Sequence, residues 1–168
     1  MKERRLENEG KAYNVHYASG KQLHDLIVKT LDQHNGLEGF RNLNKGQLST
    51  KLALFYGDID YLHPSREGNS RTLRTFTRML CKEIGYELDW STSNIDAKMR
   101  NTLYVARDRE VICRDVLGVD LETASKKSPN EVKDLVYVGS KKSKTLKSII
   151  HASLRKLSGR RLDSTVNH

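Results

Sequence analysis

Two segments with helical periodicity meet at His63-Pro64-Ser65-Arg66-Glu67-Gly68-Asn69-Ser70-Arg71-Thr72-Leu73-Arg74. Pro64 ends the first segment, because proline lacks an amide hydrogen and biases the residue before it away from the helical region. Gly68 frees the backbone for a sharp turn, and Asn69 is a preferred N-cap residue for the second segment. The stretch therefore predicts a corner between two helices.

The start of the second helix has the features of an anion site. The backbone amides near Ser70, Arg71 and Thr72 would have no intrahelical partner and would point into the turn. Arg71 and Arg74 are three residues apart and share one helical face above these amides. Because guanidinium groups bind phosphate oxygens through a bidentate fork, this end of the helix suits a nucleotide polyphosphate.

Two side chains on the other side of the turn add chemistry to this site. Glu67 is a hard oxygen ligand that could hold a magnesium ion bridging phosphates. His63 could accept a proton from an incoming hydroxyl, because the pKa of an imidazole ordinarily lies near neutrality. The alternative is a plain helical corner with solvated arginines. Each feature alone fits that corner, but their combination at this spacing favours the nucleotide site.

The stretch resembles the motif of the Fic family, which reads His-Pro-Phe-x-Asp/Glu-Gly-Asn-Gly-Arg-x-x-Arg at the junction of two helices. The matching positions are His63, Pro64, Glu67, Gly68, Asn69, Arg71 and Arg74. The similarity extends from about residue 15 to residue 90, with flanks at residues 54–62 and 85–90. It implies a helical bundle that binds ATP and magnesium.

The resemblance also implies residue roles. His63 would be the general base, and Glu67 would hold magnesium. The ATP phosphates would be bound by the turn and its arginines, namely Gly68, Asn69, Ser70, Arg71 and Arg74. The implied reaction transfers AMP from ATP to a hydroxyl side chain of a target protein, a Tyr, Thr or Ser, as in a toxin or effector protein of the family.

Two positions depart from the family motif. Ser65 replaces the phenylalanine that plugs into the core, and serine supplies no such apolar anchor. Ser70 replaces a second glycine, and we expect its side chain to point into the phosphate site and weaken nucleotide binding. Two alternatives therefore stay open: a catalytically impaired binding module, and a protein kinase like the Doc branch, which carries lysine at this position.

Composition places the chain in a broad class. Its 168 residues suffice for one domain with a real core, and its balance of 36% hydrophobic and 30% charged residues is globular. The two cysteines make no disulfide framework, which favours a reducing bacterial cytoplasm, while secretion into a host cell stays open. Residues 1–10 resemble no signal peptide, and no apolar run is long enough to span a membrane.

Periodicity predicts an all-α bundle of six to eight helices with one small β-hairpin or strand near the amino terminus. The expected helices cover residues 20–34, 44–62, 70–83, 94–107, 108–117 and 143–157, with a short helix from Ser128. His34 is expected to be solvated, and Trp90 to pack on the helices. The expected division is a flexible start at 1–12, a Fic-like core at 13–118 and a basic helical extension at 119–168.

Alternation of Tyr13, Val15 and Tyr17 predicts a strand. In the family that it resembles, a hairpin near the active loop aligns the target segment by strand addition, so Val15, His16 and Tyr17 are candidates for target docking. An ordinary edge strand is the alternative.

The tail from residue 126 to residue 168 carries eleven Lys/Arg and three Asp/Glu, a net charge of 11 − 3 = +8. Its candidate partners are nucleic acid, an acidic membrane or an acidic protein, and a solvated basic face is the alternative. Nucleic acid is not favoured, because no aromatic residues are interleaved with the charges. The family's inhibitory pattern, Ser/Thr-x-x-x-Glu-Gly/Asn, is absent from the sequence, which implies a separate antitoxin protein.

Overall fold

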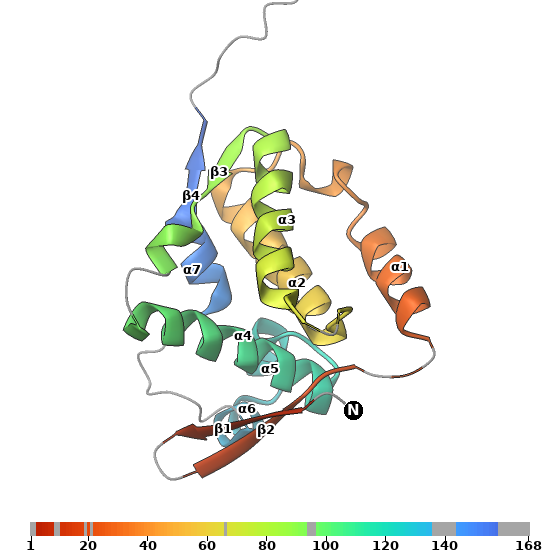
Figure 1. The fold of residues 1–168 in the computed structure, drawn as a ribbon, viewed down its shortest axis with the longest axis vertical. Coiled ribbons are helices and arrows are strands. Elements are labelled where there is room, and N and C mark those ends of the chain that lie inside the picture. The colour runs from red at the N-terminus through yellow and green to blue at the C-terminus, as the bar shows by residue number, and fades with distance from the viewer. Residues whose placement is uncertain are drawn as a thin grey trace, which may run out of the picture.

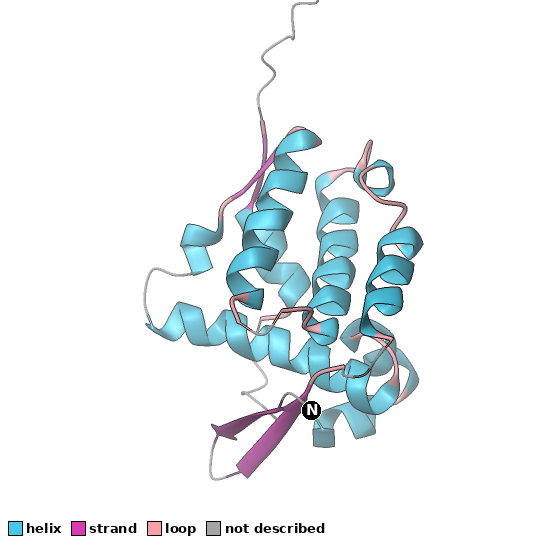
Figure 2. Cartoon of the chain, turned by 45° about the vertical axis from the view of Figure 1, so that its right-hand side comes forward, coloured by secondary structure: helices cyan, strands magenta, loops and turns pink. Residues whose placement is uncertain are grey.

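The computed structural model describes residues 3–8, 11–18, 20, 22–65, 67–93, 97–135 and 144–157. Within them the chain forms seven α-helices and two small antiparallel sheets at opposite ends of the helical body (Figures 1 and 2). The helices are α1 (Leu23–Gln33), α2 (Lys45–Leu62), α3 (Asn69–Glu83), α4 (Ala97–Leu117), α5 (Leu121–Lys127), α6 (Pro129–Leu135) and α7 (Leu146–Ser153). The strands are β1 (Glu3–Asn8), β2 (Lys11–His16), β3 (Tyr86–Leu88) and β4 (Leu154–Lys156). The predicted all-α class with a small β element is confirmed.

Helix α2 is the centre of the fold and delivers the motif. It begins with a capping box, in which the side chains and backbones of Asn44 and Gln47 exchange two hydrogen bonds of 3.0 Å. Its inward side is buried against α1, α3, α4 and α7. It ends at His63, which adopts a left-handed conformation (φ 48°, ψ 57°) and donates its amide hydrogen to the carbonyl of Ile59. Pro64 then prevents a further turn.

Helix α4 is continuous, whereas two helices were predicted over the same residues. No glycine or proline occurs between Ala97 and Leu117, so nothing in the backbone interrupts the ladder of hydrogen bonds. The polar run at residues 107–110, where a second helix was predicted to begin, is instead part of α4 and is largely buried. The helix ends at Gly118, whose positive φ of 67° is easy for glycine.

The carboxyl-terminal elements belong to the same core as the motif helices, so the predicted boundary at residue 118 does not separate two units. Leu146, Ile149, Ile150 and Leu154 are buried in one cluster with residues of α2 and α3. The predicted helix over 143–157 is shorter, because the chain extends after Ser153 and β4 pairs antiparallel with β3. Residues 158–168, the end of the basic tail, lie outside the described residues.

The amino terminus also differs from the prediction. Residues 3–8, expected to be flexible, form β1 and pair with β2 in a hairpin whose register runs from Glu3 opposite His16 to Asn8 opposite Lys11. The sequence of β1 is polar and contains few residues that favour strands. Its strand conformation therefore depends on pairing with β2. The hairpin crosses below α4 (Figure 1), and β2 packs against that helix.

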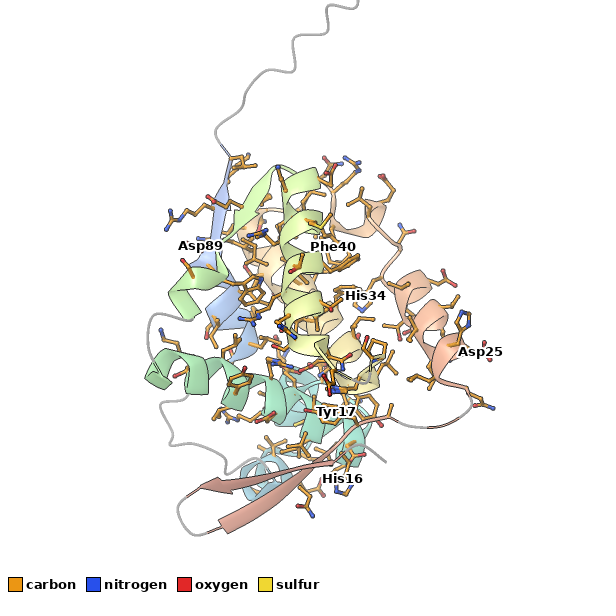
Figure 3. All side chains as sticks on the ribbon, viewed as in Figure 1. His16, Tyr17, Asp25, His34, Phe40 and Asp89 are labelled. Atoms are coloured by element: carbon orange, nitrogen blue, oxygen red, sulfur yellow. The ribbon has the colours of Figure 1, made fainter. Side chains whose placement is uncertain are left out.

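Helix α1 is shorter than the predicted range of 20–34 and is loosely packed. None of its residues is buried, and Leu26 and Leu31 remain 40% and 38% exposed. His34, which follows it, is not solvated as predicted. Its Nε2 lies 2.8 Å from a carboxylate oxygen of Asp58, and its ring packs near Phe40 (Figure 3). Within the described part of the chain, no helix is long and apolar enough to cross a membrane.

Candidate functional site

The corner between α2 and α3 is closed by the side chain of Asn69. Its amide nitrogen donates to the Ser65 carbonyl at 2.6 Å, and its amide oxygen accepts from the Ser65 backbone N–H at 2.8 Å. The N-cap position is taken by Gly68, with φ 78°, so the prediction that Asn69 caps α3 is wrong by one residue. Asn69 instead fixes the loop across its base, because both of its hydrogen bonds are made to the backbone.

The first turn of α3 presents backbone amides to this loop. The first hydrogen bond of the helical ladder runs from the Thr72 N–H to the Gly68 carbonyl at 2.9 Å. The amides of Asn69, Ser70 and Arg71 precede that bond and cannot have intrahelical partners. A helix start of this kind attracts anions through its amides and its dipole.

Arg71 and Arg74 line one pocket of about 410 Å³ beside this turn, together with Arg78. Its opposite wall comes from residues 87–91, including Trp90, whose indole N–H donates to the Arg74 carbonyl at 3.1 Å. The prediction that Arg71 and Arg74 share a face therefore fits the structure, and Trp90 packs on the helices as predicted. Arg71 also reaches back over the turn, since one guanidinium nitrogen lies 4.0 Å from where a Cβ would stand on Gly68.

His63 is held beside the turn by Tyr17. The centroids of the two rings are 3.9 Å apart, with 38° between their planes. The next residue, Ala18, donates its backbone N–H to the Tyr61 carbonyl at 2.9 Å, which ties the end of β2 to the end of α2. Figure 3 shows Tyr17 below the corner where α2 meets α3, and His16 lower, beside the hairpin.

The three candidates for target docking therefore have different environments. The side chain of Val15 is fully buried in a cluster with α4 residues such as Val111, so it cannot itself contact a target. Tyr17 packs on His63, and His16 lies with Nδ1 3.9 Å from the Asp115 carboxylate. Of the three side chains, that of His16 is the most exposed.

Glu67 is exposed on the turn, where it could reach a bound metal. Among the described residues, no group of three or more His, Cys, Asp or Glu side chains could hold a metal ion. Magnesium at phosphate sites is commonly bound by one or two carboxylates together with phosphate oxygens and water. The single carboxylate of Glu67 is sufficient for magnesium that is also bound by phosphate oxygens and water. It is not sufficient for a metal site made of protein side chains alone.

Ser70 does not point into the phosphate site as expected. Its Oγ accepts a hydrogen bond of 2.9 Å from Nη1 of Arg107, a residue of α4 that is only 5% exposed. Nε and Nη2 of Arg107 donate to the two carboxylate oxygens of Asp60 at 2.9 and 2.6 Å. Burial works to lower the pKa of Arg107, but the charge and hydrogen bonds of Asp60, together with the neighbouring tyrosines, outweigh it and raise that pKa.

Sequence reasoning missed this pair, although one signal was available. Asp60 lies one helical turn after Tyr56, on the buried side of α2, where a lone carboxylate would be costly. A charge at such a position predicts a buried cation partner. The sequence gives no sign of which of the 30 Lys and Arg residues supplies it.

An apolar pocket of about 190 Å³ lies beside Ser65, between α1, α2 and α3. Its walls include Ile27, Leu31, Phe55, Leu73 and Phe76. The serine hydroxyl fills little of this space. The structure thus fits the expectation that Ser65 supplies no apolar anchor to the loop.

No protein-family model matches the chain. Protein adenylyltransferase VbhT of Bartonella schoenbuchensis is 36% identical over 76 residues, which cover 45% of this chain and 15% of that protein. A protein adenylyltransferase of Bartonella henselae is 29% identical over 100 residues, which cover 60% of this chain and 18% of that protein. The chain therefore spans less than a fifth of the length of these two relatives.

Among solved structures, the N-terminal Fic domain of a VirB-translocated Bep effector protein from Bartonella quintana, with bound ADP, has a similar fold. The TM-score is 0.54 at 20% sequence identity, and the match covers 91% of this chain and 56% of that one. The fold is therefore similar to that of a Fic domain, and parts of the sequence, including 76 residues at 36% identity, are similar to named protein adenylyltransferases.

Proposed function

We propose that the chain is a protein adenylyltransferase that binds ATP at the corner between α2 and α3 and transfers AMP to a target hydroxyl. One observation carries the proposal: the open amides at the start of α3, Arg71 and Arg74 all border the turn that also holds His63. The names of the relatives, and the ADP bound in the matched Fic domain, support the same activity.

In the proposed reaction, His63 accepts the proton of a Tyr, Thr or Ser hydroxyl of the target. The hydroxyl oxygen then forms a bond to the α-phosphorus of ATP, the bond from that phosphorus to the bridging oxygen breaks, and pyrophosphate leaves. Stacking on Tyr17 fixes the plane of the imidazole, as a general base requires. The amides of Asn69, Ser70 and Arg71, with Gly68 at the turn and the side chains of Arg71 and Arg74, stabilise the phosphate charge.

Glu67 is the proposed magnesium ligand, because it is the carboxylate on the turn. Magnesium, when bound there with ATP, neutralises phosphate charge. The arginines provide the rest of the positive charge from the protein side. This division of roles agrees with a turn that carries one carboxylate beside several cationic groups.

The partners are proposals as well. The substrate is a protein with an accessible Tyr, Thr or Ser, and a separate antitoxin would restrain the enzyme. A bacterial cytoplasm is the proposed compartment, and delivery into a host cell is supported by the VirB-translocated effector whose Fic domain matches. The basic tail offers a surface for nucleic acid, which remains the less favoured partner.

The test uses ATP labelled at either the α- or the γ-phosphate, incubated with the protein, magnesium and cell lysate. We expect label from the α-position on a target protein and none from the γ-position, whereas the reverse would indicate a kinase. His63→Ala should abolish transfer while leaving the thermal unfolding midpoint near that of the parent. A parent protein that is folded but binds no ATP at millimolar magnesium would overturn the proposal in favour of a binding module.

A further inference from the structure

A buried arginine that is not part of the motif touches the phosphate-binding turn. Nε and Nη2 of Arg107 donate hydrogen bonds to Asp60, and the remaining nitrogen, Nη1, donates to Ser70. A guanidinium fork held at both ends by a carboxylate has a fixed plane, so the direction of Nη1 is fixed too. The rings of Tyr56 and Tyr104 lie 5.7 and 5.5 Å from its central carbon and limit any tilt.

This arrangement is hard to explain by stability alone. Removing two charges from water costs several kcal/mol per ion, and a buried ion pair often contributes no more than apolar side chains of similar size. Asp60 is 2% exposed and Arg107 5% exposed, so both are almost completely removed from solvent. The ion pair instead fixes the orientation of Arg107, so that its Nη1 donates from α4 to Ser70, the second residue of α3.

The position of that residue matters for phosphate. Ser70 lies in the first turn of α3, where the amides of residues 69–71 face the loop. These amides can bind phosphate together only while the turn is held in place, so a contact that anchors Ser70 also anchors them. With Oγ bonded to Arg107, the side chain is held toward the interior between α2 and α4.

We propose that Arg107 is a positioning residue for the phosphate-binding turn: anchored by Asp60, it holds Ser70 inward and keeps the first turn of α3 open to phosphate. The proposal rests on the proposed function in that the phosphate belongs to ATP. It also reverses the expected effect of Ser70→Gly, because removing the hydroxyl removes the contact with Arg107.

The experiment compares Ser70→Ala, Arg107→Lys and the double variant. Ser70→Ala removes only the acceptor, and Arg107→Lys keeps the charge for Asp60 but loses the fork. We expect each single variant to weaken ATP binding, measured by calorimetry with magnesium, by about tenfold, the size of one hydrogen bond to a charged group. The double variant should be no weaker than Arg107→Lys alone, because both changes break the same contact.

A second measurement does not depend on nucleotide. Among the amides of residues 69–72, that of Thr72 is hydrogen-bonded, to the Gly68 carbonyl, and its exchange in the ATP-free protein should be about tenfold faster in Ser70→Ala than in the parent, because the turn is released from α4. If the parent binds no ATP, the proposed function fails, but the exchange rates still show whether Arg107 positions the turn. The exchange rates of Ser70→Ala answer the same question if Arg107→Lys does not fold.

Arg114→Lys is the matched control. Arg114 is a second buried arginine of α4 that pairs with an aspartate of α2, but its hydrogen bonds go to Asp58, Glu110 and the Leu54 carbonyl, away from the motif. It should lower the unfolding midpoint without changing ATP affinity or exchange at residues 69–72. Additive effects of Ser70→Ala and Arg107→Lys, or unchanged exchange in Ser70→Ala, would overturn the proposal.

Discussion

Arg107 and Arg114 lie two turns apart on α4, and each makes an ion pair with an aspartate of α2, yet their surroundings differ. Arg114 is enclosed by acceptors of the scaffold, with Nε on Asp58 at 2.7 Å and Nη1 on Glu110 at 2.5 Å. Arg107 has one such partner, Asp60, and directs its last donor to Ser70 in the motif. The comparison teaches that an Arg–Asp ion pair between α2 and α4 can stabilise the fold or orient a site. Which of the two it does depends on the acceptor of the guanidinium N–H groups that the aspartate leaves unused.

The largest effect is expected from removing either guanidinium. Arg114→Ala removes the ion-pair partner of Glu110 and leaves Asp58 with His34 alone, and Arg107→Ala removes the ion-pair partner of Asp60, so each should lower the free energy of unfolding by about 3–5 kcal/mol. Urea unfolding at pH 7 measures this loss. A decrease of less than about 1 kcal/mol in the free energy of unfolding of either variant would contradict this prediction. The arginine concerned would then not be needed to compensate the charge of its carboxylate partners.

Gly57→Ala should act on the Arg114 side only. A Cβ at this position would lie 2.6 Å from Nη2 of Arg114, which three acceptors hold in place. Overpacking costs about 1–3 kcal/mol and should outweigh the gain of about 1 kcal/mol in helix propensity. The unfolding midpoint in urea checks the sign, and ATP affinity should stay at the parent's value. A stabilised Gly57→Ala protein would mean that Arg114 moves freely.

Ser65→Phe tests whether the contact from Arg107 is sufficient to order the loop. The ring should enter the apolar pocket beside Ser65 and raise the free energy of unfolding by about 1.5 kcal/mol, as for burial of a large apolar side chain. If Arg107 already fixes the turn, ATP affinity should change less than twofold. A large gain in affinity without a gain in stability would show that the loop is disordered in the parent, and Ser65→Ala is the control for loss of the hydroxyl.

The smallest effect at neutral pH is expected from Tyr56→Phe, beside Arg107. Burial raises the pKa of Tyr56 to about 12, with Arg107 opposing and Asp60 reinforcing the shift. Since an unfolded tyrosine ionises near pH 10, the folded state keeps a proton that the unfolded state loses. Stability should therefore fall as pH rises from about 10 toward 12, and Tyr56→Phe should flatten that decline. Urea unfolding at pH 7, 10 and 11 measures it, and equal slopes in both proteins would contradict it.

Local signals in the sequence predicted the motif helices well. Periodicity predicted a helix over 44–62, Pro64 marks its end, and the three-residue spacing of Arg71 and Arg74 places both arginines in one pocket. These features depend on neighbours within a few residues, and such interactions can be inferred without knowing the tertiary fold.

The features that were missed depend on distant partners. Arg107 meets Asp60 across 47 residues, and His34 meets Asp58 across 24. Strands β3 and β4 are only three residues long, and each has its partner far along the chain. The predicted direction of the Ser70 side chain was wrong because the sequence does not show that Arg107 lies next to it in the fold.

The pairing of β4 with β3 has a mechanical consequence. Strand β3 and the residues after it form one wall of the arginine pocket, and β4 is bound to that wall along its whole length. Two further backbone bonds, from Asp89 to the Ser153 carbonyl and from Leu157 to the Gly85 carbonyl, fasten its two ends. Leu157, the last residue that the structure describes, is therefore bound to the wall of the pocket. A force applied at Leu157 would act on that wall before any other part of the described fold.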